Sequence, residues 1–191
     1  QNNAVKLEET GVVRHLFTTR TGGVSKGVCA TMNLSFSRGD DPEAVMENYR
    51  RIGEVLGVAP DHMAASRQTH TTNIHLVTET DLGNGITRPS AYEEIDGLAT
   101  DQPGIALVTY YADCVPLYFV DPVHQAIGLA HSGWRGTVSR MGEHMVQFMQ
   151  EQFQSRPEDL VAAIGPSICV NCYEVSKELA EEFALEFQTQ I

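Results

Sequence analysis

Three short apolar runs between residues 104 and 132 constrain the fold of this 191-residue chain more than any other feature. The runs GIALVTYY, PLYFVD and AIGLAHS each have the length of a strand and are rich in apolar and aromatic residues, which favours largely buried strands. The last two runs are separated by DPVHQ, a segment typical of a turn, so they are predicted to form a hairpin.

Helical patterns flank these strands. Apolar residues recur at helical spacing in three segments, and Asp41 and Ser176 stand where a helix N-cap is expected. The predicted helices are residues 40–57, 136–153 and 176–187. Further strands are predicted at residues 12–19, 73–79 and 160–165, and a Gly-, Ser- and Thr-rich loop at residues 20–35. The pattern predicts one α+β domain spanning residues 1–191, and the 42% content of hydrophobic residues suffices for a core.

The net charge and the absence of long apolar segments argue against several classes of function. A formal net charge of −12 argues against nucleic-acid binding, because an acidic surface repels phosphate backbones. The apolar runs are too short to span a membrane and no secretory signal is visible, so a cytoplasmic protein with no membrane partner is expected. Its four cysteines are then expected to stay reduced. The chain starts without Met and stops inside a predicted helix, so part of the parent protein is expected to be missing.

Three separated residues are candidate metal ligands. His70 stands at the entry to a predicted strand, Cys114 stands just before the hairpin, and His131 stands near its end. Imidazole and thiolate groups both bind zinc, and three protein ligands leave a fourth position open for water or substrate. Spacing alone leaves two alternatives open. Cys114 and His131 could form a nucleophile and its base without a metal, or all three residues could be structural.

Other polar residues have weaker signals. Asp113 could orient a ligand or carry a proton, and Arg20 and Arg135 could bind a phosphate or carboxylate, although surface ion pairs are the plain alternative. The pair Cys169 and Cys172 forms a single C-x-x-C, which is interpreted as two loop thiols because the second half of a four-cysteine zinc site is absent. The sequence contains no H-x-E, no H-x-H, and no glycine-rich phosphate-binding motif.

Taken together, the segments resemble one known family. In order, they are HLFTTRTGGVSKG, MNLS, ENYRRI, RQTHTTNIHLV, DGLAT, YYADCVPLYFVDP, AIGLAHSGWRGT and AIGPSICVNCYEV. They are similar to the bacterial laccase-like polyphenol oxidases, which are also described as purine nucleoside phosphorylases. The resemblance implies a single-domain α/β/β/α sandwich with mixed sheets. It also implies a zinc ion, with copper as the alternative, bound by His70, Cys114 and His131.

The same resemblance implies the activity. It predicts phosphorolysis of adenosine, inosine, guanosine and methylthioadenosine, and deamination of adenosine, with Cys114, Asp113 and Arg135 as catalytic residues. Substrate and phosphate contacts are predicted at Arg20, Arg135 and Gln68. The alternatives are copper-dependent phenol oxidation and amide hydrolysis that edits peptidoglycan precursors. The predicted partners are a purine nucleoside and phosphate, in a monomer or homodimer that lacks the family's C-terminal segment.

Overall fold

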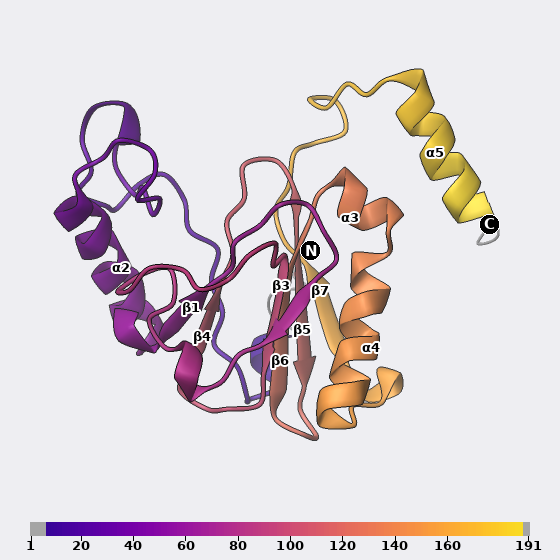
Figure 1. Ribbon diagram of the computed structural model, residues 1–191, viewed down its shortest axis with the longest axis horizontal. Coiled ribbons are helices and arrows are strands. Elements are labelled where there is room, and N and C mark those ends of the chain that lie inside the picture. Colours follow the sequence, from indigo (N-terminus) through magenta and orange to yellow (C-terminus); the bar gives the residue numbers. More distant parts are fainter. Residues whose placement is uncertain (1–6, 189–191) are drawn as a thin grey trace.

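The computed structural model describes residues 7–188, and these form an α/β/β/α sandwich with two sheets (Figure 1). Helix α2 (Pro42–Leu56) lies outside a small sheet of two parallel strands, β1 (Met63–Ala65) and β4 (Ala106–Val108). A larger sheet follows, and helices α3 (Trp134–Val138) and α4 (Met141–Phe153) cover its far side. The predicted fold class is therefore confirmed.

The larger sheet has five strands in the order β2-β3-β6-β5-β7. The bounds are β2 (Ile74–Leu76), β3 (Gly97–Thr100), β5 (Val115–Asp121), β6 (Ala126–Ser132) and β7 (Val161–Ile164). β2 and β3 are parallel, and all other neighbours are antiparallel. The predicted hairpin is confirmed as β5 and β6, in register from Val115 opposite Ser132 to Asp121 opposite Ala126.

The predicted helix at residues 40–57 is confirmed as α2, because its capping signals act as expected. The Asp41 side chain accepts a hydrogen bond from the Glu43 backbone N–H at 3.0 Å, and Pro42 occupies the first turn. Gly57 ends the helix in the left-handed conformation at φ 75°. The helix buries Val45 and Tyr49 against the small sheet.

One predicted helix is interrupted. Residues 136–153 were expected to be continuous, but the chain breaks at Arg140, whose φ of 58° is incompatible with a helix. The methionine face predicted for the second half is confirmed, since Met141, Met145 and Met149 are fully buried in the core. Gly128 of β6 makes this packing possible, because a Cβ there would lie 2.8 Å from the Met145 Sδ.

The strand predicted at residues 12–19 is wrong. This segment is extended but pairs with no strand among residues 7–188. It runs between the two sheets, where the Leu16 carbonyl accepts a hydrogen bond from the Tyr118 hydroxyl at 3.5 Å and His15 packs edge-on against the Tyr118 ring. The residues that alternate like a strand thus line a cleft, exposed or partly exposed, rather than pairing in a sheet.

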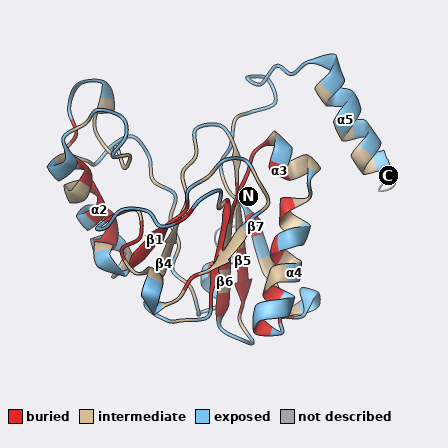
Figure 2. Ribbon diagram, viewed as in Figure 1, coloured by how far each residue is buried: buried red, intermediate tan, exposed pale blue. Residues whose placement is uncertain are grey.

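The remaining elements are short or peripheral. Four 3-10 turns occur at η1 (Gly27–Cys29), η2 (Pro60–His62), η3 (Glu79–Asp81) and η4 (Pro157–Asp159). Helix α5 (Lys177–Phe187) confirms the last predicted helix, and Ser176 caps it at the Leu179 N–H. None of its residues is buried (Figure 2). Among residues 7–188, every helix lacks the length and apolar content needed to cross a membrane.

Candidate metal centre

His70, Cys114 and His131 converge at one end of the larger sheet. One ligand atom from each lies within 4.8 Å of the others, so the group could hold a metal ion. The Cys114 Sγ is 3.9 Å from the His70 Nε2, and the two imidazole rings are 5.0 Å apart between centroids. The β5–β6 hairpin brings two of the three residues, Cys114 and His131, close together. Cys114 immediately precedes β5, and His131 lies opposite Pro116 near the end of β6.

His70 lies on a loop, and hydrogen bonds to a buried carboxylate hold that loop in place. Asp96, a fully buried residue just before β3, accepts hydrogen bonds from the loop that carries His70. The donors are the backbone N–H groups of Thr69, His70 and Thr71, at 2.9–3.0 Å, and the Thr71 hydroxyl at 3.0 Å. These bonds hold His70 at φ 66°, a conformation that residues other than glycine seldom adopt.

The same carboxylate orients the second imidazole. The His131 Nδ1 lies 2.7 Å from the Asp96 Oδ1, and the His131 backbone N–H donates to the Asp96 carbonyl at 2.8 Å. A carboxylate at Nδ1 keeps the proton on that nitrogen and leaves Nε2 available to a metal, as is usual for metal-binding histidines. Burial pushes the pKa of Asp96 upward, but hydrogen bonds from His131, Thr69 and Thr71 outweigh burial and lower that pKa to about 2. The carboxylate is therefore charged at neutral pH.

The cysteine is poorly suited to act as a free nucleophile. Burial, followed by the nearby carboxylates of Asp113 and Asp96, raises the pKa of the Cys114 thiol above its ordinary value. A nucleophilic cysteine needs a lowered pKa, so this environment disfavours the metal-free pair of Cys114 and His131. A bound cation would instead lower the pKa of the Cys114 thiol, because a metal ion stabilises the thiolate and displaces its proton.

Gly133 allows the three candidate ligands to approach one another. It follows β6, and a Cβ at this position would lie 2.7 Å from the His70 Cδ2 and 3.1 Å from the Cys114 Sγ. A side chain would therefore occupy the space between these two ligands. The close approach makes the glycine a structural requirement of the centre.

We expect Gly133→Ala to weaken zinc binding by at least about tenfold, because displaced ligands bind a metal less well. Zinc affinity can be measured by competition with a chromophoric chelator. The matched control is Gly142→Ala in α4, where the added Cβ meets only the Leu117 Cδ1 at 3.8 Å. The control should keep its zinc affinity. Equal zinc affinity in Gly133→Ala and the control would contradict the proposed packing.

The donor set fits zinc and copper. Two imidazole nitrogens and one thiolate are ligands of catalytic zinc sites, and the same atoms also bind copper. Three protein ligands leave a coordination position for a substrate atom. Asp96 provides the carboxylate that usually hydrogen-bonds the second nitrogen of a metal-binding histidine.

The other predicted site residues are placed differently. Asp113 is exposed and lines the cleft beside Cys114. The Gln68 amide is largely occupied, since its Oε1 accepts from the Ser66 hydroxyl and the Tyr110 N–H, and its Nε2 donates to the Tyr110 carbonyl at 2.7 Å. Arg20 and Arg135 are exposed and do not line the cleft. The Arg135 guanidinium stacks 4.2 Å from the centroid of its neighbour Trp134.

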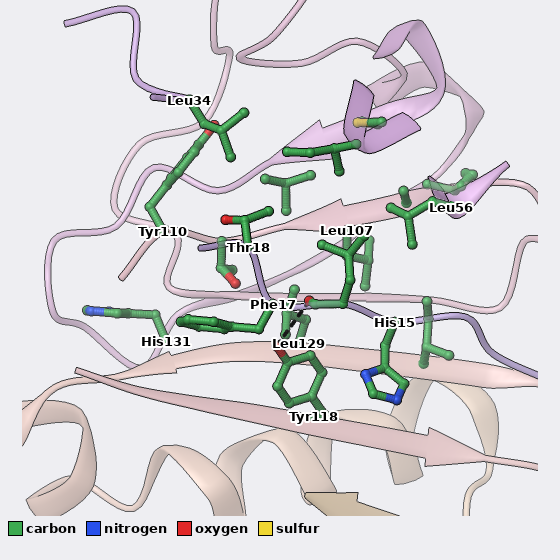
Figure 3. A pocket seen from close by; sticks show the side chains of 18 of the residues that line it. His15, Phe17, Thr18, Leu34, Leu56, Leu107, Tyr110, Tyr118, Leu129 and His131 are labelled. Carbon is green, nitrogen blue, oxygen red and sulfur yellow. Dashed lines mark hydrogen bonds between the residues drawn. The ribbon is translucent and has the colours of Figure 1, made fainter. Parts of the chain in front are cut away.

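A large cleft leads to the three candidate ligands. Its volume is about 1660 Å³, and it lies between the two sheets, with residues 11–18 along one wall. Phe17 and His131 lie at the same end of the cleft in Figure 3. The Tyr111 ring connects them, at 6.0 Å from Phe17 and 5.7 Å from His131 between centroids. An apolar aromatic wall thus stands next to the candidate ligands.

Three residues of the centre were not predicted from the sequence: Asp96, Gly133 and Tyr111. A signal existed for Asp96, because an acidic residue directly before a buried strand needs hydrogen-bond donors. Gly133 had the weaker signal of a glycine directly after a strand that ends in a candidate ligand. Tyr111 precedes Cys114 by three residues, but no pattern indicated that its ring would face His131.

A family model described as multi-copper polyphenol oxidoreductase laccase matches residues 14–190. A purine nucleoside phosphorylase YlmD of Geobacillus stearothermophilus is 41% identical over 165 residues, which cover 86% of this chain and 60% of that protein. A purine nucleoside phosphorylase of Deinococcus radiodurans is 41% identical over 171 residues, covering 90% of this chain and 63% of that protein. The chain thus spans less than two thirds of the length of these relatives.

Solved structures show the same fold. The crystal structure of YlmD from Geobacillus stearothermophilus matches with a TM-score of 0.83 and 40% identity, over 88% of this chain and 63% of that chain. A hypothetical protein YfiH of Bacillus licheniformis matches with a TM-score of 0.84 and 34% identity, over 90% of this chain and 67% of that chain.

Proposed function

Because the chain belongs to the multi-copper polyphenol oxidoreductase laccase family, we propose that it works as a zinc-dependent enzyme on purine nucleosides. The proposed reactions are phosphorolysis of adenosine, inosine, guanosine and methylthioadenosine, and deamination of adenosine. The observation that carries the proposal is the convergence of His70, Cys114 and His131 beside a cleft. The names of the Geobacillus and Deinococcus relatives support the substrate class.

The proposed roles follow from the chemistry of the site residues. His70, Cys114 and His131 would hold the ion, which when bound supplies Lewis-acid stabilisation of developing negative charge. Phe17 and Tyr111 offer aromatic surface on which a purine ring can stack.

Proton transfer and phosphate binding are assigned to polar residues outside the ligand set. Asp113, exposed beside Cys114, is the proposed carrier of a proton between substrate and solvent. Arg20 and Arg135 remain the proposed phosphate partners, because neither forms an ion pair with any carboxylate in residues 7–188. Gln68 has one free amide hydrogen left for a substrate contact.

Copper-dependent phenol oxidation is the second candidate. Two observations favour it: the description of the matching family model, and a donor set of two imidazoles and a thiolate that copper also accepts. Zinc is the better proposal for nucleoside chemistry, because it has no redox activity and an open zinc position acts as a Lewis acid.

The nucleoside assay separates the two. The chain, loaded with zinc alone, is incubated with adenosine in the presence and absence of phosphate, and products are separated by chromatography. We expect adenine to form only with phosphate, and inosine to form without it. The same protein loaded with copper is tested on a phenol. Phenol oxidation without any nucleoside turnover in the zinc form would overturn the proposal in favour of the second candidate.

A further inference from the structure

Two cysteines stand apart from the metal centre on a tight turn after β7. The Cys172 backbone N–H donates to the Cys169 carbonyl at 2.9 Å, so the turn brings the two side chains to the same side. Their Sγ atoms lie 2.6 Å apart, in direct contact. Both thiols are free and both residues are exposed. A solvent-borne reagent can therefore reach either sulfur.

The turn is anchored to the larger sheet. The Ile168 N–H donates to the Asp113 carbonyl at 3.0 Å, and the Gly165 N–H donates to the Pro116 carbonyl at 2.9 Å. The segment leading to Cys169 is thus fixed along β5 rather than swinging freely. Because the turn already holds the two cysteines together, joining their sulfurs costs little additional chain entropy.

The two thiols are not equivalent. A side-chain hydrogen bond from Cys172, with a backbone hydrogen bond from Asn171, lowers the pKa of Cys169 below its ordinary value. The same contact raises the pKa of Cys172. Cys169 therefore has the larger thiolate fraction at neutral pH, and the thiolate is the form that attacks a disulfide.

We propose that Cys169 and Cys172 form a redox-active dithiol that small-molecule disulfides oxidise, a modification site separate from the metal centre. The Cys169 thiolate attacks one sulfur of the small disulfide, forms a mixed disulfide and releases one thiolate. Cys172 then loses its proton to solvent, attacks the Cys169 Sγ and releases the second thiolate. The protein loses two electrons and gains one disulfide bond, while the small disulfide is reduced to two thiols.

The other cysteines lack this arrangement. Cys29 has only a long sulfur contact, 3.9 Å to the Arg38 carbonyl, and no second thiol on its loop. Cys114 faces His70 in the metal centre, and its pKa is raised rather than lowered. These two residues serve as internal controls in the same molecule.

The test uses the reduced chain, oxidised glutathione as the probe, and peptide mass mapping as the readout. We expect an intramolecular bond between Cys169 and Cys172, seen as the loss of one hydrogen from each thiol and reversed by dithiothreitol. Cys172→Ser should instead retain a stable glutathione adduct on Cys169. Cys169→Ser should form its adduct on Cys172 more slowly than Cys172→Ser forms its adduct on Cys169, because less thiolate is present. Cys29→Ser should behave as the unmodified chain does.

Two outcomes would overturn the inference. One is equal reactivity of Cys29 and Cys169 toward oxidised glutathione. The other is the accumulation of separate glutathione adducts on Cys169 and Cys172 with no bond between them. The readout is the state of the thiols, so it is independent of nucleoside turnover. Circular dichroism of the variants is the control for folding, and the exposed substitutions are expected to leave the spectrum unchanged.

Discussion

Replacing Cys114 by serine is expected to remove high-affinity zinc binding from this protein. Serine keeps the size of the side chain but exchanges the thiolate for a hydroxyl, which is protonated at neutral pH and is a poor zinc ligand. The loss of affinity should exceed the 10–100-fold that is typical for losing an outer partner of a metal site. Catalytic turnover should fall with it, since Cys114 is one of the three candidate ligands that lie together in residues 7–188.

Thermal unfolding measures this effect without any substrate. A ligand present at about 100 times its dissociation constant stabilises the folded state by about 2.7 kcal/mol, so zinc should raise the melting temperature of the unmodified chain. Cys114→Ser should lose that increase, while the control Cys29→Ser should keep it. A zinc-dependent increase of equal size in Cys114→Ser would remove Cys114 from the ligand set.

Asp96→Asn is expected to harm both the fold and the metal centre. The carboxylate of Asp96 accepts five hydrogen bonds, and an amide presents hydrogens to at least some of those donors. Buried donors without acceptors are costly, so the free energy of unfolding should fall by about 3 kcal/mol. Zinc affinity should fall roughly 10–100-fold, because His131 loses the group that fixes its tautomer and His70 loses its loop anchor.

Chemical unfolding and zinc titration measure the two effects separately. Asp61→Asn is the matched control, since Asp61 is exposed and its carboxylate contacts only its own turn, including the neighbouring His62 side chain. It should unfold and bind zinc like the unmodified chain. A small loss of stability in Asp96→Asn with unchanged zinc affinity would show that Asp96 supports the fold but does not position the metal ligands.

Much of the fold was predictable because its signals are local. Capping residues and apolar spacing predicted α2, and the two apolar runs around DPVHQ predicted the β5–β6 hairpin. That hairpin brings Cys114 and His131 together, so part of the centre follows from local sequence alone. His70 was a candidate from its place at the entry to a predicted strand, but its position more than forty residues from Cys114 gives it no local link to the hairpin, so only the family resemblance implied that it joins the other two.

The features that were missed depend on tertiary contacts. Asp96 organises the centre through donors from residues 69–71 and 131, a pairing that no local pattern contains. Residues 12–19 have the alternation of a strand, but they lie along the cleft between the sheets and pair with no strand among residues 7–188. The helix break at Arg140 was also missed, because apolar spacing does not show that this residue adopts a left-handed conformation. The Arg140 side chain contacts Glu186 of α5, a partner distant in sequence.

The proposed function needs one metal ion bound by the sulfur of Cys114 and the nitrogens of His70 and His131. X-ray absorption at the zinc edge of the zinc-loaded chain measures those ligands directly. We expect one sulfur at about 2.3 Å and imidazole nitrogens at about 2.0–2.1 Å from the ion. A spectrum with nitrogen and oxygen ligands but no sulfur would contradict this expectation.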